Sequence, residues 1–514
     1  MDRMVYQTDA PGRMVRAGAR EWAGLGVLTL AVVLLAVDGT VLALAVPSLS
    51  ADLAPTATQL LWIGDIYSFA LAGLLITMGN VADRVGRKHL LLIGSVGFGL
   101  SSIFAAMATT PEMLIAARAV LGISGATLMP STLSIVRSMF AKPAQRTRAI
   151  AIWSAGATGG AAAGPLIGGA LLESFEWGAV FLINVPVVVV IVIAGAILLP
   201  ESRNPSRASI DVLSAVLSIA AIVPIVYGVK HAIGDGFDAT VVVALVVGVA
   251  SAAVFVRRQR RLVTPLIDLD LFRVPAFSGA VIANTLSVFA FSGLLFFFSQ
   301  YLQLVRGFSP FVAGLAELPS TIASIAVIAV IGVILRKLGA GRAIGGGLAV
   351  AGVGFAVLAA AEGLDGYLAM AVGLAIIGLG VGVSMTLSTD AIVGAAPRER
   401  AGAAASISET GYELGVALGI AVLGSLQMLI YRATLTVPAG LPAGHADALR
   451  DSLANGSALL DPTDAVAGRA LEAAQHSFTT GMQVTSVVAA LVLFAAAVIA
   501  WRVIPSTRGR AEIH

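Results

Sequence analysis

Cysteine is absent from this chain of 514 residues, and charged residues make up only 12% of it. Without cysteine the protein can form no disulfide, no thiolate metal site and no cysteine nucleophile. The low charge, together with 58% hydrophobic residues, excludes the composition of a water-soluble domain. The first twenty residues also lack the apolar stretch of a signal peptide. We therefore expect the first long apolar run itself to direct insertion into a membrane.

Signatures of catalysis and of nucleic-acid binding are missing as well. The sequence has no Walker-type phosphate loop, no paired-histidine site and no serine triad motif, and its five histidines fall in loops or near the ends of apolar runs. The net charge of +3 comes from arginines dispersed among short loops, without interleaved aromatic residues. These absences predict a protein that is not an enzyme, carries no metal or cofactor, and binds no nucleic acid.

Long apolar runs dominate what is present. Each has about twenty residues, which is enough for a helix to cross a hydrocarbon layer roughly 30 Å thick. The fold class predicted is therefore all-α integral membrane, with fourteen transmembrane helices. We place them at residues 22–45, 60–79, 89–108, 113–136, 148–172, 177–199, 211–230, 239–256, 276–303, 310–335, 342–361, 367–391, 402–430 and 478–503.

Basic residues fall in alternate gaps between these runs. One set of gaps, which includes both ends of the chain, holds 26 of the 32 Lys and Arg residues; the other holds only five, and Arg118 lies inside a run. Because cytoplasmic loops are enriched in Lys and Arg, the first set marks the cytoplasmic face. The sequence thus predicts a multi-pass protein of a bacterial inner or plasma membrane with both termini in the cytoplasm.

The runs divide into six, two and six. A repeat supports the pairing of the two larger blocks, because glycines seven residues apart bracket charged residues at Gly79 to Gly86 and again at Gly332 to Gly339. A polar stretch before the last run is either a surface cap or a mobile linker. The predicted organisation is a cytoplasmic tail at 1–21, a six-helix bundle at 22–200, two inserted helices at 201–257, a second six-helix bundle at 258–503 with an external loop at 431–477, and a cytoplasmic tail at 504–514.

Small residues form a stripe on the fifth run, which also contains Pro165. A second stripe lies on the corresponding helix of the second block. Residues four apart share a helix face, so each stripe lets another backbone approach closely. Ordinary close packing is one interpretation, and an interface that moves during function is the other; the symmetric placement favours the second. The stripes consist of Gly156, Gly160, Gly164 and Gly168, and of Gly411, Gly415 and Gly419.

These features together resemble the major facilitator superfamily, and within it the fourteen-helix drug:proton antiporter family. The resemblance covers nearly the whole chain and is nearest to actinobacterial efflux of multiple drugs and quaternary ammonium compounds. The pattern around Gly164 and Pro165 is typical of antiporters in the superfamily. The matching segments are Val37-Asp38-Gly39-Thr40 through Pro47, Gly79 through Lys88, Leu114 through Arg118 to Gly125, Gly156 to Gly169, Phe181 to Pro186, and Ser408-Glu409 to Gly415.

The resemblance implies a conformational role for the loop after the second run. There Asp83 is expected to latch two helices at the cytoplasmic face in one state of a transport cycle, either at a helix N-terminus or by pairing with a neighbouring arginine. The alternative is a basic loop that serves only topology. The gating residues predicted in this loop are Gly79, Asp83, Arg84, Gly86 and Arg87, in addition to the stripe from Gly156 to Gly168 with Pro165.

Charged residues inside the apolar runs are the main candidates for chemistry. Each costs about 2.5 to 3.5 kcal/mol to insert, so such residues usually face a partner or an aqueous cavity. Asp38, Arg118 and Asp65 are the predicted proton-coupling residues. Our hypothesis is that Arg118 pairs with deprotonated Asp38 and that protonation releases the pair. For Asp65 a role at the helix end is the alternative.

Three further acids are the predicted substrate-binding residues. Glu409 and Glu413 are four residues apart and share a helix face, and Glu317 would support them in attracting a lipophilic cation. Phe291 and Tyr301 are candidate stacking partners. Most of the aromatic run to which these two belong is instead expected to face lipid or neighbouring helices.

Two functions fit this pattern. The first is proton-coupled efflux of lipophilic, mainly cationic drugs and dyes by alternating access, carried out by a single copy of the chain in contact with membrane lipid and driven by the proton gradient. The alternative is a dedicated proton-driven exporter of an endogenous metabolite, antibiotic, siderophore or lipid. A facilitative importer or a membrane receptor is disfavoured by the antiporter-like Gly164-Pro165 pattern and by the embedded acids.

Overall fold

The computed structural model describes residues 17–202, 211–234, 236–262, 265, 267–396 and 401–506. The regular elements in these ranges are helices, and fourteen candidate spans are long and apolar enough to cross a membrane. The predicted all-α membrane fold with fourteen transmembrane helices is therefore confirmed. The tails predicted at 1–21 and 504–514 fall mostly outside the described residues.

The first six spans form one group. Several have clear start signals, such as the Thr56 hydroxyl, which accepts from the backbone N–H of Gln59 at the start of α2. The sixth span begins with one short turn, α6, before α7. The helices are α1 (Ala19–Leu53), α2 (Ala57–Val85), α3 (Arg87–Ala106), α4 (Pro111–Met139), α5 (Pro143–Ser174), α6 (Ala179–Leu182) and α7 (Asn184–Leu198).

Two inserted helices, α8 (Val212–Gly234) and α9 (Ala239–Gln259), precede the second group of six spans. A short 3-10 turn, η1 (Leu271–Arg273), leads into that group, and its first span ends in a π-helical turn, η2 (Tyr301–Val305). The remaining helices are α10 (Pro275–Gln300), α11 (Pro310–Val327), α12 (Ile331–Leu338), α13 (Ala340–Ala361), α14 (Leu368–Ala395), α15 (Ala401–Thr434) and α18 (Ala465–Val503).

The span predicted as one helix at 310–335 is interrupted. Between α11 and α12 the backbone tightens into turns in which Ala329 and Val330 donate to the carbonyls three residues earlier. The residues from Ile325 to Val330 are all apolar, so the hydrophobic pattern runs unbroken through the turn. The sequence therefore gave no signal for this break.

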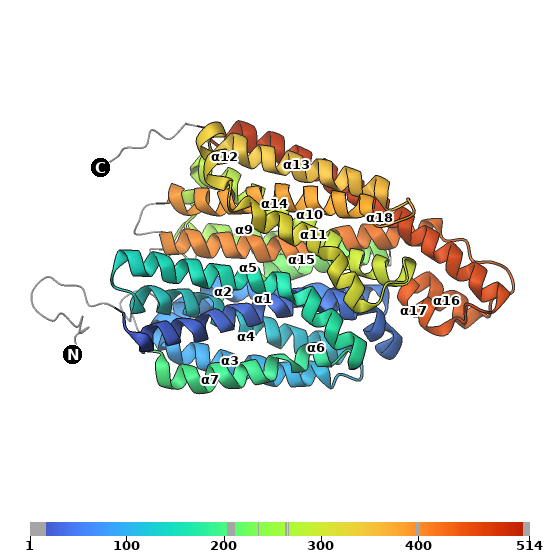
Figure 1. The fold of residues 1–514 in the computed structure, drawn as a ribbon, viewed down its shortest axis with the longest axis horizontal. Helices are drawn as coiled ribbons and strands as arrows, with labels where there is room; N and C mark the ends of the chain where they lie inside the picture. The colour runs from blue at the N-terminus through green and yellow to red at the C-terminus, as the bar shows by residue number, and fades with distance from the viewer. Residues whose placement is uncertain are drawn as a thin grey trace, which may run out of the picture.

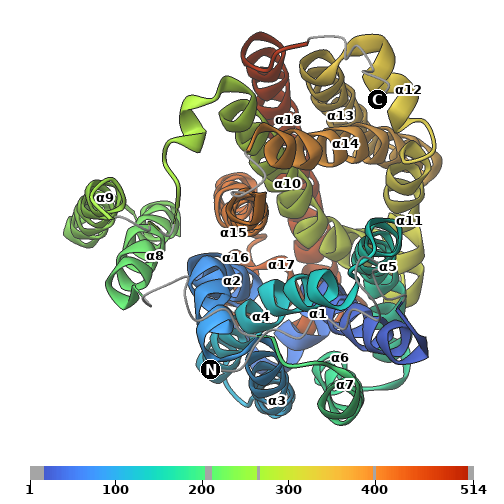
Figure 2. The same cartoon turned by 90° about the vertical axis from the view of Figure 1, so that its left-hand side faces the viewer.

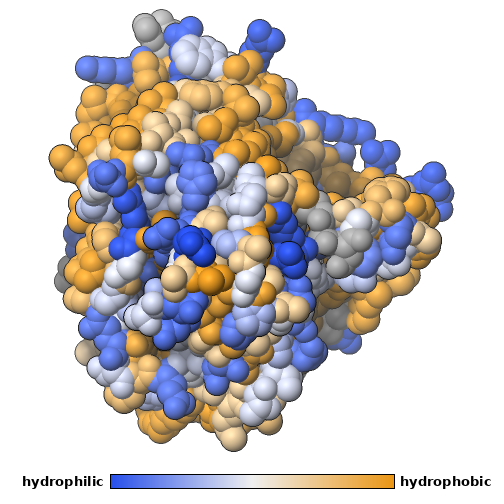
Figure 3. Space-filling model, turned by 90° about the vertical axis from the view of Figure 1, so that its right-hand side faces the viewer, coloured by the Kyte–Doolittle hydropathy of each residue, from blue (hydrophilic) through white to orange (hydrophobic). Residues whose placement is uncertain are grey.

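The polar stretch predicted as an external loop is itself helical. It contains α16 (Ala443–Asp451) and α17 (Leu453–Leu459), and α18 already begins at Ala465. These elements lie together at one end of the molecule, which we call the cap end, as Figure 1 shows. The opposite end, where α1 begins and α18 ends, is the terminal end. Figure 3 views the cap end, where hydrophilic side chains gather over the centre and hydrophobic ones cover the flanks.

The two groups of six are built alike. In the first, α5 packs along α1, and in the second, the equivalent helix α15 packs along α10. The predicted glycine stripes make both contacts close: a Cβ at Gly160 would lie 2.9 Å from the Val33 carbonyl oxygen, and one at Gly419 would lie 2.2 Å from the Phe289 carbonyl oxygen. Glycine is required at such positions because any side chain would separate the backbones.

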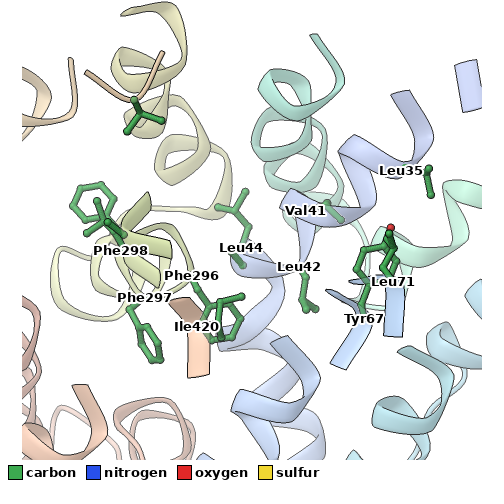
Figure 4. Packing of buried hydrophobic residues seen from close by; sticks show 14 of the residues in the cluster. Leu35, Val41, Leu42, Leu44, Tyr67, Leu71, Phe296, Phe297, Phe298 and Ile420 are labelled. Carbon is green, nitrogen blue, oxygen red and sulfur yellow. The ribbon is translucent and has the colours of Figure 1, made fainter. Parts of the chain in front are cut away.

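The two most extensive contacts between the groups are also equivalent. Helix α2 packs on α15, and α5 packs on α11. Beside them, the Gln303 side chain donates to the Leu44 carbonyl at 3.0 Å. Figure 4 shows Leu44 of α1 lying toward Phe296 of α10 and Ile420 of α15. These contacts lie in the halves of the helices nearer the cap end.

The inserted pair lies to one side of the two groups. Helix α8 contacts both α2 and α15, whereas α9 packs on α8. We call the contact between α2 and α15 the seam. Figure 2 views the molecule from the terminal end and shows α8 and α9 beside this seam, away from α5 and α11. One of the two equivalent contacts between the groups is thus covered by an additional helix.

Candidate functional site

Asp38 and Arg118 form an ion pair inside the first group of helices. Asp38 lies on α1 and Arg118 on α4, and Nη1 of Arg118 is 3.5 Å from Oδ2 of Asp38. Both side chains are buried, with 0% and 2% of their surface exposed. Arg118 also donates from Nε to the Ile63 carbonyl at 3.1 Å, and its guanidinium lies 4.9 Å from the centre of the Tyr67 ring. The structure therefore brings together the two residues whose pairing we predicted, while their role in proton coupling stays a prediction.

Asn184 completes this pair, and sequence reasoning gave it no role. Its Nδ2 donates to Oδ1 of Asp38 at 2.8 Å and lies 3.2 Å from the hydroxyl of Ser102 on α3. Asn184 is the first residue of α7 and is buried. An asparagine in an apolar run, two residues before Pro186, was the available signal. Arg118 of α4 and Asn184 of α7 thus hold the Asp38 carboxylate of α1, and Ser102 of α3 contacts Asn184.

Asp65 belongs to a different pair. Its Oδ2 lies 2.6 Å from Nζ of Lys230 on the inserted helix α8, and these side chains are 0% and 1% exposed. The ammonium also lies 3.9 Å from the centre of the Trp62 ring. Lys230 appeared in the sequence as one of five basic residues on the poorly charged side, so its burial was missed. Its position in the last turns of an apolar run was compatible with either a loop or a buried residue.

The acids of the second group lack such partners. Glu317 on α11 is buried, and its Oε1 has no hydrogen-bond partner. Glu409 and Glu413 on α15 are partly exposed. No ion pair involves any of the three in the described part of the chain. The hydroxyl of Ser68, on α2 in the opposite group, is placed to donate to Glu413.

Tyr67 connects the two sets of acids. It is buried on α2, next to Ser68, and its ring lies beside Arg118. Asp38 and Glu413 are both close enough to act on it electrostatically. Sequence reasoning did not single it out, because a tyrosine in an apolar helix is usually a packing residue. Here it stands between the paired carboxylate of the first group and an unpaired one of the second.

The two predicted stacking residues differ in their surroundings. Phe291, on α10, is partly buried and packs against the main apolar core. The hydroxyl of Tyr301 donates to the Glu362 carbonyl, and its ring stacks on Phe298 with centroids 6.0 Å apart. Tyr301 therefore links η2 to the end of α13 at the cap end of the second group. The substrate-binding roles of both residues stay predictions.

Glu362 is a further buried acid that the sequence did not reveal. It follows the last residue of α13 and is 2% exposed. The hydroxyl of Ser486 on α18 donates to its carboxylate at 3.1 Å. The span predicted at 342–361 ends one residue before it, and an acid at a helix end is ordinarily exposed.

The predicted loop from Gly79 to Lys88 is mostly helical, because α2 continues to Val85 and α3 begins at Arg87. The junction of these two helices adopts one of the geometries predicted for a latch. Asp83 pairs with Arg87 at 2.8 Å, and the Arg87 guanidinium donates to the Ser202 hydroxyl at 3.2 Å. Gly86 has φ +122°, a conformation that side chains rarely adopt, and Arg84 is exposed. Gly79, about two turns earlier in α2, faces Pro130 of α4. These contacts stay within the first group, so the gating role remains a prediction.

The second face of α5 meets the other group. The carbonyl oxygen of Pro165 lies 2.5 Å from where a Cβ would stand on Gly314 of α11, and Gly169 approaches Phe311 with similar closeness. Its first face carries the glycine stripe, where a Cβ on Gly164 would lie 1.9 Å from the Thr40 hydroxyl. The stripe therefore packs within one group, while Pro165 contributes to the contact between groups.

Comparison with known proteins supplies the family. Residues 28–420 match the family model described as Major Facilitator Superfamily. The chain belongs to this superfamily. The resemblance inferred from the motifs is thus confirmed, and the chain is a multi-pass membrane protein of a family of transporters.

Three relatives cover nearly the whole chain. The chain is 44% identical to the multidrug efflux pump LfrA of Mycolicibacterium smegmatis, over 94% of this chain and 96% of the relative. It is 38% identical to the methyl viologen resistance protein SmvA of Salmonella typhimurium, over 89% and 93%. The tetracenomycin C resistance and export protein of Streptomyces glaucescens is 32% identical, over 94% and 91%.

A solved structure confirms the fold. The bacterial homolog of the human lysosomal transporter Spinster superposes with a TM-score of 0.65 and covers 94% of this chain and 98% of its own. Its sequence identity is 16%, so the likeness concerns the arrangement of helices alone.

Proposed function

We propose that the protein is a proton-coupled antiporter that exports lipophilic, mainly cationic compounds by alternating access. The observation that carries this proposal concerns α15, where Glu409 and Glu413 are partly exposed and lack a basic partner among the described residues. Asp38 and Asp65, by contrast, are each paired with a base. Unpaired carboxylates near apolar helices attract an organic cation, because ion pairing and apolar contact then act together. The relatives named for multidrug efflux and methyl viologen resistance support the same substrate class.

The proposal assigns the terminal end to the cytoplasm of a bacterium, where most of the basic residues lie. The contacts between the two groups then lie toward the external side. On the cytoplasmic side, α5 exposes a small polar face that includes Ser154 and Thr158, which suits water better than lipid. We therefore interpret the conformation as inward-facing, with Glu409 and Glu413 reached from the cytoplasm.

Proton coupling is assigned to Asp38. In the ionised form it is held by Arg118 and Asn184; a proton arriving on Asp38 removes the charge that fixes Arg118. Exporting one monovalent cation against an inside-negative membrane potential costs about 2.3 kcal/mol per 100 mV, and one returning proton cancels that amount. The cycle thus uses the proton gradient without a cofactor, and one copy of the chain contains all the residues it needs.

Movement between the two conformations is assigned to the close glycine contacts. The pair α1 and α5 and the pair α10 and α15 have small residues at their interfaces, so each can slide with little steric cost. The segment from Gly79 to Arg87, at the junction of α2 and α3, would latch helices at the cytoplasmic side when the two groups approach there. In the present state Asp83 and Arg87 pair with each other, and Arg87 donates to Ser202 after α7.

A dedicated exporter is the second candidate. It is favoured by relatives at similar coverage that are named for single antibiotics, such as the tetracenomycin C protein at 32% identity. Both candidates share the family and the acids, so substrate range distinguishes them.

The decisive experiment is ethidium efflux from cells that express the chain, with and without a protonophore. We expect efflux that the protonophore abolishes and that Asp38→Asn reduces to background, while Asp390→Asn, an exposed acid on α14, serves as the matched control. Ethidium accumulation unaffected by expression of the chain would contradict multidrug export. Efflux that survives Asp38→Asn would instead remove the coupling assignment.

A further inference from the structure

The inserted helix α8 is fastened to both groups of helices. Val226 packs with Phe69 of α2 and with Ala417 and Ala421 of α15 in a small buried apolar cluster. The Ser218 hydroxyl donates to the Gly73 carbonyl of α2 at 3.2 Å. Any movement of α2 against α15 must therefore disturb the surface on which α8 sits.

Lys230 brings its side-chain amine to this seam. Its ammonium touches the Asp65 carboxylate at 2.6 Å and lies against the Trp62 ring at 3.9 Å. Trp62 and Asp65 are three residues apart on α2, so one helix face presents an indole and a carboxylate together. Tyr227 extends the aromatic wall, with its ring centroid 6.5 Å from that of Trp62.

An indole beside a carboxylate is the chemistry that recognises an organic cation. A cation over an aromatic face is attracted by the ring quadrupole, most strongly when both are removed from water, and the carboxylate adds an ionic contact. In this conformation the chain supplies the cation itself. The ammonium of Lys230 occupies the position that a lipophilic cation would take between Trp62 and Asp65.

The remaining charged groups nearby are engaged elsewhere. Arg118 acts on Asp65 electrostatically but is bound to Asp38 and to the Ile63 carbonyl. His231, next to Lys230, stacks on Tyr227 and lies 3.2 Å from Asp238. Lys230 is thus the group in direct ionic contact with Asp65.

We propose that Lys230 is a tethered cation that occupies Asp65 in this state and that an exported cation must displace. When the displaced ammonium leaves Asp65, α8 loses its ionic attachment to α2, and the seam between α2 and α15 is freed to move. Lys230 is accordingly a positioning residue, which acts on transport through Asp65. This inference rests on the proposed function, because it assumes that the substrate is cationic.

Binding of tetraphenylphosphonium to the purified protein in nanodiscs tests the proposal. In Lys230→Met the side chain keeps a similar length and loses its charge, so the tethered competitor is gone. We expect affinity to rise on the order of tenfold, since a tethered group competes at a high effective concentration. In the Asp65→Asn background the same substitution should change the affinity less than about twofold, and Lys230→Arg should bind as the wild type does.

An unchanged affinity in Lys230→Met, or an equal gain in the Asp65→Asn background, would overturn the proposal. If Lys230→Met does not elute as a single species in size-exclusion chromatography, the proposal is tested on the wild-type protein instead. Tetraphenylphosphonium should then increase labelling of Lys230 by a membrane-permeant amine reagent, measured by mass spectrometry, relative to Lys88, Lys142 and Lys337. Labelling of Lys230 that does not change would equally reject the tethered cation.

The role of Lys230 can be refuted separately from the proposed function. Wild-type protein that binds tetraphenylphosphonium and exports ethidium, but is indifferent to Lys230→Met, keeps the proposed function and refutes the role of Lys230. Wild-type protein that neither binds nor exports these cations refutes both.

Discussion

The embedded acids of the two six-helix groups have different surroundings. In the first group, Asp38 faces Arg118 and Asp65 faces Lys230, so each buried carboxylate is matched by a base. In the second group, Glu317, Glu409 and Glu413 have no such partner in the described part of the chain. Protonation of a paired acid leaves its base as an uncompensated positive charge, whereas an unpaired acid offers its negative charge to a cation. The difference assigns coupling to the pair of Asp38 and Arg118 and the first attraction of a cationic substrate to the unpaired acids of the second group.

The largest expected effect tests the paired side of this comparison. Arg118→Met leaves Asp38 buried without its cation, and removing one partner of a buried ion pair costs about 3 to 5 kcal/mol of stability. We expect the midpoint of thermal unfolding in detergent to fall strongly. The double variant Arg118→Met with Asp38→Asn should recover most of the loss, because no charge is then left unpaired.

The contrast with Glu317→Gln sharpens this test. That substitution removes an acid without a basic partner, so it should not lower the unfolding midpoint. If Arg118→Met and Glu317→Gln had the same unfolding midpoint, the pairing of an acid with a base would make no difference to stability.

A second prediction concerns the feature that the two groups share. A Cβ on Gly160 would lie 2.9 Å from the Val33 carbonyl oxygen, and one on Gly419 would lie 2.2 Å from that of Phe289. Substituting alanine at either site should cost about 1 to 3 kcal/mol through overpacking and slow ethidium efflux. Gly159→Ala is the matched control, since nothing lies within 4 Å of its Cβ position. Equal stability of Gly160→Ala and Gly159→Ala would contradict close packing of α1 and α5.

The sequence predicted the fold better than the site. Long apolar runs reveal helices because each must satisfy its own backbone in the membrane, and the glycine stripes report helix faces through their spacing of four. The pairing of Asp38 with Arg118 followed from their common depth. Depth alone could not show that Lys230 reaches Asp65, because that contact depends on where α8 docks against α2. The break between α11 and α12 was hidden for a similar reason, since apolar residues continue through it.

Asn184 and Tyr67 illustrate the same limit. Each is an uncharged residue in an apolar helix, and its importance comes from neighbours contributed by other helices. Single-sequence reasoning identifies charged residues in a membrane because they are costly there. A neutral hydrogen-bonding residue costs less and so attracts less attention, although it can decide how a charge is held.

The third prediction tests the unpaired side. Glu413→Gln removes a negative charge from a partly exposed position and leaves no base without a partner, so the protein should remain as stable as the wild type. Binding of tetraphenylphosphonium should weaken about tenfold, which corresponds to ~1.4 kcal/mol. Asp390→Asn, which removes an exposed acid on α14, should leave binding unchanged. Equal effects of the two substitutions would mean that the overall negative charge, and not the position of Glu413, attracts the cation.

The smallest expected effect lies in the inserted pair, outside the membrane-spanning segments. Asp211 precedes α8 and pairs with Arg258 at the end of α9 at 2.9 Å. Burial alone would raise the pKa of Asp211, but hydrogen bonds from Arg258 and Ser214 outweigh it, so the pKa lies below the ordinary carboxyl range. A lowered pKa stabilises the folded state above the unfolded-state pKa, and this contribution is lost as the pH falls through the folded-state pKa.

Asp211→Asn should therefore reduce stability by about 0.5 kcal/mol near neutral pH, as expected for a partly solvated ion pair. The difference from the wild type should disappear in acid, where Asp211 itself becomes protonated. Thermal unfolding measured from neutral to acidic pH provides the comparison, and Asp447→Asn, in an exposed pair with Arg450, is the control. A difference that persisted at low pH would show that Asp211 acts through its shape and not through its charge. The joint between α8 and α9 would then be held by packing, in contrast to the ionic attachment between α8 and α2.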